Sequence, residues 1–181
     1  MKSLKTFILE NNEMINGKGI SFNELDFIEI TSLQQLSKLL KETKTNVQKK
    51  TGFWLFLEAL EKDKRSYANI KKEPWFIEYC CLSYNGTPIG LISYSLTHGE
   101  DDDRAEQYKP NLYILDIQTL PQYKGFLSHY FKFLENKAKE NQKDYLILMC
   151  YEPSLERVYA KYGFEKVENE NLMFKKIIKT E

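Results

Sequence analysis

The sequence carries no excess of charge of either sign. Its 181 residues include 26 Lys and Arg and 26 Asp and Glu, which gives a formal net charge of zero at pH 7. Proteins that bind nucleic acid or an acidic membrane through their overall charge are strongly basic. We therefore expect neither nucleic acid nor a membrane among the partners of this chain.

Cysteine, histidine and long apolar segments are also scarce. The chain has three cysteines and two histidines, with Cys80 next to Cys81, no C-x-x-C pair and no Cys/His cluster to hold a metal. Buried, reduced thiols are the simplest interpretation. No stretch approaches the ~18 apolar residues of a membrane-spanning helix, and the N-terminus lacks the apolar core of a signal peptide. We expect a cytoplasmic protein without a metal.

The length predicts a single domain that is large enough to bury a core. Residues 1–25 show no clear periodic pattern and are treated as an N-terminal extension, in which the letters NGKG at residues 16–19 mark a turn. The domain itself is predicted over residues 26–181.

The first strand and helix of this domain have local signals. Residues 26–30 alternate between polar and apolar types, as a half-buried strand does. A capping box then predicts the start of a helix, either at Thr31 with Gln34 or at Ser32 with Gln35.

A second helix and a hairpin follow. Residues 53–64 are predicted to be helical, and their aromatic residues are those of a packed core. An Asn-Gly pair at residues 85–86 separates two strand-like segments, residues 75–83 and 88–96. Because both central residues of a two-residue hairpin turn need positive φ, Asn-Gly is a strong hairpin signal.

The second half contains the stretch with the clearest chemical meaning, residues 111–164. Its elements are a strand (112–118), a turn through Gly125, a helix (126–140), a strand (145–150) and a short helix (154–161) that Gly163 ends. Residues 165–168 and 171–178 then predict a closing antiparallel pair. One hairpin-rich half and one βαβ crossover together predict an α+β fold with a mixed, mostly antiparallel sheet of six to seven strands and helices on both faces.

The turn at Gly125 is a candidate anion site. A strand that turns sharply into a helix leaves backbone N–H groups without intrahelical partners, and the helix dipole adds partial positive charge. This arrangement suits a phosphate or a diphosphate.

Three segments give the chain its resemblance to the GNAT N-acetyltransferase superfamily. The tail PSLERVYAKYGFEKV resembles the family's helix that ends in Tyr-x-Lys-x-Gly-Phe, with Tyr159 and Gly163 in register. The hairpin NGTPIGLISYSL is similar to the family's second and third strands. The letters QYKGFL at residues 122–127 match the acyl-CoA loop Q/R-x-x-G-x-G/A, except that Leu127 replaces the final small residue. Leucine adds bulk where a small residue lets the backbone approach the diphosphate.

The resemblance implies an α+β GNAT-like fold and a direct transfer of an acetyl group from acetyl-CoA to an amine. It implies that Tyr159 is the general acid that protonates the CoA sulfur. It also implies a cofactor site in which the end of a strand binds the pantetheine arm through backbone groups and the following loop binds the diphosphate. The matching residues are Ile117, Gln118, Thr119, Gln122, Tyr123, Lys124, Gly125, Phe126, Leu127 and Ser128.

Several residues are candidates for the base that deprotonates the amine. Asp116 lies near the acetyl position that the resemblance implies, and Glu78 on an earlier strand is the alternative; His98 and His129 rank below both. Cys150 as an acyl carrier is disfavoured because no histidine lies near it in the sequence.

Two functions remain open from the sequence. One is an active acetyltransferase, and the other is a catalytically weak or inactive GNAT-like module that binds acyl-CoA or a protein, which the bulk of Leu127 favours. The acceptor is an amine on a small molecule, a peptide or a protein, and the acidic residues 100–106 favour a cationic one. The resemblance also makes a homodimer a candidate state.

Overall fold

The chain is described by a computed structural model, which defines residues 15–32, 34–35, 38–39, 77–96, 111–120, 122–168, 170 and 172–178. The predicted helix at residues 53–64, the acidic residues 100–106 and His98 lie outside the described residues, as do residues 33, 36–37 and 40. Where the first helix is predicted to begin, Ser32 and Gln35 form a reciprocal capping box. The Gln35 N–H donates to the Ser32 hydroxyl at 3.2 Å, and the Ser32 N–H donates to the Gln35 side chain at 3.2 Å.

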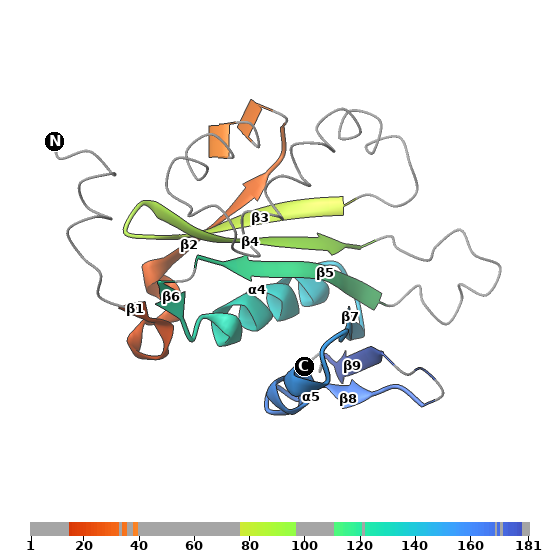
Figure 1. Cartoon of the computed structure of the whole chain (residues 1–181). Helices are drawn as coiled ribbons and strands as arrows, with labels where there is room; N and C mark the ends of the chain where they lie inside the picture. The colour runs from red at the N-terminus through yellow and green to blue at the C-terminus, as the bar shows by residue number, and fades with distance from the viewer. Residues whose placement is uncertain are drawn as a thin grey trace, which may run out of the picture. The chain divides into compact units, whose positions relative to one another are not determined.

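The described strands form the mixed sheet that the sequence predicts. Seven strands lie in the order β2-β3-β4-β5-β7-β9-β8, and β1 and β6 form a separate two-stranded sheet. The strands are β1 (Ile15–Asn16), β2 (Leu25–Ile30), β3 (Ile77–Tyr84), β4 (Thr87–Ser95), β5 (Asn111–Thr119), β6 (Tyr123–Lys124), β7 (Tyr145–Met149), β8 (Glu165–Lys166) and β9 (Met173–Ile177). Figure 1 shows β2 beside β3 and, in the C-terminal part of the chain, β9 beside β8. The predictions of an α+β fold and of a mixed, mostly antiparallel sheet of six to seven strands are confirmed, with seven strands present.

The hairpin between β3 and β4 has the predicted turn. Asn85 and Gly86 both have positive φ, 50° and 71°. This is the backbone that a two-residue turn of the primed type requires, and it matches the twist of the flanking strands. The two-residue turn sets the register in which β3 and β4 pair.

The chain divides into two compact units. The first comprises Met1–Asn69, Tyr79–Leu91 and Gln118–Phe126, and the second comprises Ile70–Glu78, Ile92–Ile117 and Leu127–Glu181. In the first unit β2 pairs antiparallel with β3, from Leu25 opposite Tyr84 to Ile30 opposite Tyr79. The buried side chains of this unit include Leu25, Ile30, Tyr79, Cys80, Cys81, Leu82, Ile89, Leu91, Tyr123 and Phe126.

In the second unit β7 lies between β5, to which it is parallel, and β9, to which it is antiparallel. Helix α4 (Leu127–Glu140) packs on β7. The helix buries one face, formed by Tyr130, Phe131, Phe133, Leu134 and Ala138, as the spacing of its apolar residues predicts.

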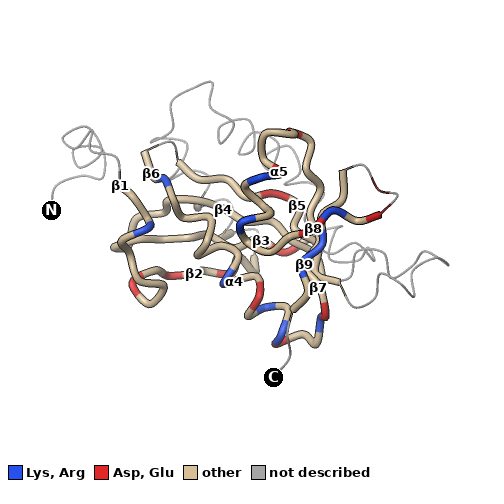
Figure 2. The backbone as a smooth tube through the Cα atoms, turned by 90° about the horizontal axis from the view of Figure 1, so that it is seen from below, with Lys and Arg blue, Asp and Glu red and all other residues tan. Residues whose placement is uncertain are grey.

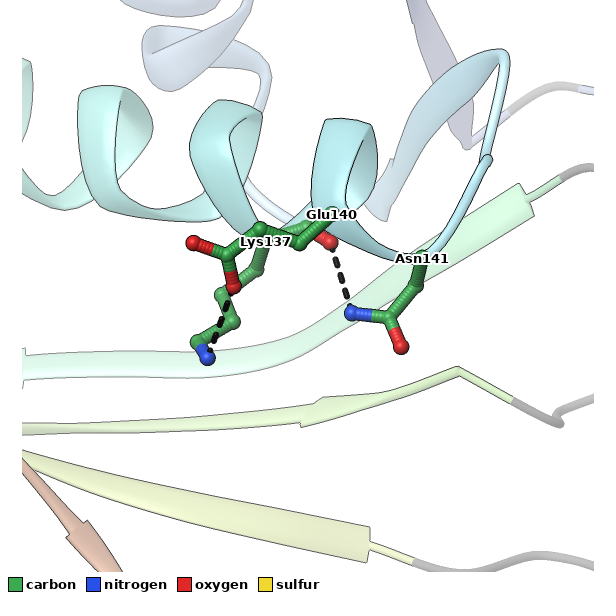
Figure 3. Close-up of polar contacts among 3 residues, drawn as sticks. All are labelled: Lys137, Glu140 and Asn141. Atoms are coloured by element: carbon green, nitrogen blue, oxygen red, sulfur yellow. Dashed lines mark hydrogen bonds and ion pairs between the residues drawn. The ribbon is translucent and has the colours of Figure 1, made fainter.

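The C-terminal end of α4 is closed by local hydrogen bonds. The Lys143 N–H donates to the Ala138 carbonyl at 2.8 Å and the Gln142 N–H donates to the Lys139 carbonyl at 3.1 Å, which is a Schellman motif with Gln142 (φ 55°) at the left-handed position. Figure 3 shows the Asn141 side chain donating to the Lys137 carbonyl at 2.9 Å. It also shows the Lys137 ammonium 3.0 Å from the Glu140 carboxylate. The helix therefore ends where the sequence predicts.

Basic and acidic residues are interspersed along the described backbone (Figure 2). In the second unit, Lys176 pairs with Glu135 and Lys166 lies 3.8 Å from Glu156. Within the residues that the structure describes, no helix has both the length and the apolar character needed to cross a membrane.

Candidate active site

The pairing of the parallel strands β5 and β7, in the second unit, ends before β5 does because β7 ends at Met149. Their pairing runs from Asn111 opposite Tyr145 to Ile114 opposite Leu148 and stops there, although β5 continues to Thr119. Just past this point Leu115 and Met149 are 42% and 41% exposed. The strands thus leave uncovered apolar surface at the place where the resemblance implies a pantetheine arm.

Helix α5 (Pro153–Ala160) follows β7 and carries Tyr159. Pro153 stands in the first turn, where its missing N–H costs no helical hydrogen bond. At the other end the Phe164 N–H donates to the Tyr159 carbonyl at 3.3 Å and the Gly163 N–H donates to the Ala160 carbonyl at 3.0 Å. Gly163 has φ 83°, so the predicted glycine stop is confirmed as a Schellman motif.

The Tyr159 ring is held by other aromatic rings. Its centroid lies 6.3 Å from that of Phe131 on α4, 6.2 Å from that of Phe164 and 6.4 Å from that of Phe174 on β9. All three phenylalanines are buried. A ring packed in this way keeps one orientation, and the direction of its hydroxyl is fixed with it.

The surroundings of the Tyr159 hydroxyl favour its neutral form. Burial raises the pKa of Tyr159 above its ordinary value of 10.0, and the nearby ionisable groups Cys150, Asp116 and Glu152 raise this pKa further. Side chains on a helix lean toward its N-terminus, so the phenol is directed toward the start of α5, where Cys150 and Glu152 lie. The structure therefore brings Asp116, the residue predicted as the base, into electrostatic range of Tyr159.

Glu152 is a neighbour of Tyr159 that is absent from the predicted site residues. It is exposed at the N-cap position of α5, and its carboxylate makes no capping hydrogen bond. The separation of seven positions from Tyr159 places both on one face of the helix. That periodicity is the only sequence signal that could have found it.

The remaining candidates have other surroundings. Glu78 is partly buried on β3 and His129 is partly buried on α4. Cys150 is a free, buried thiol whose Sγ–H donates to the Glu152 carbonyl at 3.1 Å. Cys80 and Cys81 are also free and buried, so the prediction of reduced thiols is confirmed.

The predicted cofactor loop lies largely in the first unit. The Tyr123 N–H donates to the Leu120 carbonyl at 2.9 Å, and the Leu120 N–H donates to the Ile89 carbonyl at 2.8 Å. Tyr123 and Phe126 are buried with their rings edge to face at 6.1 Å, and burial, followed by the charge of Tyr84, raises the pKa of Tyr123. Because these rings are buried, Lys124 is the exposed side chain of residues 123–126.

The other predicted cofactor residues flank this loop. Gly125 has φ 77°, Gln122 and Leu127 are partly buried and Ser128 is exposed. Ile117, Gln118 and Thr119 are partly buried on β5, beyond its pairing with β7.

A segment near the N-terminus lies against this loop, which sequence reasoning missed. β1 pairs in parallel with β6, with Ile15 opposite Tyr123 and Asn16 opposite Lys124. The predicted turn at residues 16–19 is confirmed as a 3₁₀ helix, Gly17–Gly19. Each of these strands has two residues, which is too short for an alternating pattern of apolar and polar residues to appear in the sequence.

No model of a known protein family and no curated protein matches the sequence. Solved structures do match. A putative acetyltransferase of the GNAT family from Desulfovibrio desulfuricans has a TM-score of 0.56 at 8% identity, over 86% of this chain and 99% of the other. The PaiA N-acetyltransferase from Thermoplasma acidophilum in complex with coenzyme A has a TM-score of 0.53 at 13% identity, over 84% of this chain and 98% of the other. The ribosomal-protein-S18-alanine N-acetyltransferase from Escherichia coli has a TM-score of 0.54 at 9% identity, over 87% of this chain and 96% of the other.

The chain has the fold of the GNAT acetyltransferases.

Within this GNAT fold, the crossover from β5 through α4 to β7 is the part that the sequence described best. Its strand, loop and helix all have local signals, and the structure has each of them within two residues of the predicted bounds. Leu127, which departs from the GNAT loop pattern, is the first residue of α4 and is partly buried.

Proposed function

We propose that this chain is an N-acetyltransferase that moves an acetyl group from acetyl-CoA directly to an amine. The observation that carries the proposal is Tyr159, a phenol held by packed rings with Asp116 in electrostatic range. Structures of the same fold include one in complex with coenzyme A. They also include an acetyltransferase whose name gives a ribosomal protein as its acceptor, so a protein acceptor is among the candidates beside a small amine.

The proposed reaction needs three proton transfers. Asp116 takes a proton from the ammonium group of the acceptor, and the free amine attacks the thioester carbonyl to form the C–N bond. The C–S bond then breaks and Tyr159 donates its proton to the departing sulfur, while the nitrogen of the new amide loses its extra proton, which restores the phenol. Because the pKa of Tyr159 is raised above 10.0, the phenol keeps its proton throughout the neutral range.

The cofactor would be bound mainly by backbone groups. Residues 117–119 extend past the β5–β7 pairing and are proposed to hydrogen-bond the pantetheine arm as an added strand would. Residues 122–128 are proposed to bind the diphosphate with the N–H groups that begin α4.

The alternative is a module that binds acyl-CoA or a protein partner without catalysis. It is favoured by Leu127, whose side chain stands where the GNAT loop has a small residue. A module that binds acyl-CoA would be stabilised by CoA yet release no thiol, and one that binds only a protein would do neither.

Free thiol released from acetyl-CoA in the presence of a panel of amines tests the proposal. We expect turnover with at least one amine, and we expect Tyr159→Phe to lower kcat about 10²-fold while the KM for acetyl-CoA changes little. Tyr162→Phe is the matched control, because Tyr162 also contacts the Phe131 ring, at 5.0 Å. An unchanged kcat in Tyr159→Phe would remove Tyr159 from the mechanism.

Thermal unfolding with and without CoA separates the two functions. A ligand at ~100 times its Kd adds about 2.7 kcal/mol to the free energy of unfolding. A shift without thiol release favours a module that binds acyl-CoA. No shift at millimolar CoA favours a module that binds a protein partner and contradicts the proposed enzyme.

A further inference from the structure

Two glycines from distant parts of the first unit are packed against each other's segments. A Cβ atom at Gly17 would lie 2.7–2.9 Å from three ring atoms of Phe126. A Cβ atom at Gly125 would lie 2.7 Å from the Asn16 Oδ1 atom and 3.2 Å from Lys18 Cγ. Residues 16–18 therefore lie closer to residues 125–126 than a side chain at either glycine would permit.

The parts of the loop that face this segment are themselves fixed. The Phe126 ring is 1% exposed and packs edge to face on Tyr123, so it has little freedom to move away from Gly17. Gly125 has φ 77°, a conformation that other residues rarely adopt. Each glycine thus lets side chains of the other segment, Phe126 at Gly17 and Asn16 at Gly125, lie against its backbone.

Hydrogen bonds hold the segment in place. The Ile15 N–H donates to the Gln122 carbonyl at 3.0 Å, which joins β1 to the loop. The Lys18 N–H donates to the Asn16 Oδ1 atom at 3.1 Å, which closes the turn. The same Asn16 oxygen therefore both caps the turn and contacts Gly125.

We infer that the turn at Asn16 and Gly17 is a positioning element of the cofactor loop and sets the affinity of the protein for acetyl-CoA. The inference rests on the proposed function. Backbone N–H groups bind a diphosphate well only if they already converge on it, because ordering a loose loop on binding reduces the affinity. A segment that adds to β6 as a strand and packs on Gly125 and Phe126 holds residues 122–126 in one conformation before the ligand arrives.

The test measures steady-state kinetics of the full chain carrying Asn16→Ala. We expect the KM for acetyl-CoA and the Kd for CoA to rise about tenfold, with kcat and the KM for the amine unchanged. Gly17→Ala, whose new methyl group would push the turn away from the Phe126 ring, should also raise the KM for acetyl-CoA and the Kd for CoA. Asn23→Ala is the matched control, because Asn23 is exposed on the neighbouring 3₁₀ helix Phe22–Glu24 and should shift neither.

Each outcome has one meaning. A KM for acetyl-CoA that stays constant while the unfolding temperature falls assigns the turn a purely structural role and overturns the inference. A lower KM also overturns it, because the segment would then compete with the cofactor. Absence of turnover and of CoA binding in the unaltered chain would instead refute the proposed function.

Discussion

Replacing Gly125 with alanine should destabilise the protein by more than the same change at Gly86. Both glycines have positive φ, 77° and 71°, so alanine costs about 1–2 kcal/mol at either position, of which about 0.4–1 kcal/mol is returned because alanine restricts the unfolded chain. A Cβ atom at Gly86 meets nothing within 4 Å. Gly86→Ala should therefore lower the free energy of unfolding by about 1 kcal/mol.

At Gly125 a steric term is added. The new Cβ atom would lie 2.7 Å from the Asn16 Oδ1 atom and 3.4 Å from the Lys18 backbone nitrogen. Asn16 must move, which breaks its bond to the Lys18 N–H at a cost of about 1 kcal/mol, and the residual overpacking costs about 1 kcal/mol or more. Gly125→Ala should thus cost about 3 kcal/mol in total, or roughly 6–12 °C in unfolding temperature for a chain of this length.

Thermal unfolding of four proteins tests this reasoning: Gly86→Ala, Gly125→Ala, Asn16→Ala and the double variant of Asn16 and Gly125. Removing the Asn16 side chain makes room for the new methyl group, so the double variant should cost at least about 1 kcal/mol less than the sum of the single variants. If Gly125→Ala is no worse than Gly86→Ala, and if the double variant is additive, the contact between the N-terminal turn and the loop is absent in solution.

Two further predictions concern stability. Gln142 holds a left-handed conformation at the end of α4, φ 55°, so Gln142→Gly should raise the free energy of unfolding by about 0.5–1 kcal/mol in denaturant titrations; a loss would contradict the assigned helix end. The pKa values of Tyr159 and Tyr123 are both raised by folding, so their contribution to stability is complete below pH ~10 and declines as the pH rises above it. The unfolding temperature should therefore fall above pH 10, and less steeply in Tyr159→Phe; equal slopes would show that Tyr159 titrates normally.

The parts of the fold that could be predicted are those whose cause is local. Asn85-Gly86 and Gly163 each set a backbone conformation that few residues adopt, and the apolar stripe of α4 lies within one element. Each of these signals acts over a few residues, so the local structure that it predicts does not depend on contacts with distant segments.

The parts that could not be predicted depend on contacts between distant segments. Residues 16–19 carry a turn signal, yet nothing in those letters indicates that the turn packs on Phe126. Glu152 stands at the N-cap position of α5 but is not one of the residue types that usually cap a helix, and its side chain makes no capping hydrogen bond. Its position beside the Tyr159 phenol follows from the direction of α5, which the packing of Phe131, Phe164 and Phe174 determines.

The register of Tyr159 with Gly163 and Phe164 has a structural cause that explains why the tyrosine can be tested cleanly. In a Schellman motif the residue after the glycine contacts the residue five positions before it, and here those residues are Phe164 and Tyr159, with ring centroids 6.2 Å apart. That contact requires an aromatic ring at position 159 but uses no hydroxyl. Phenylalanine therefore preserves the helix end and the ring packing, so a fall in kcat in Tyr159→Phe is attributable to the lost proton donor.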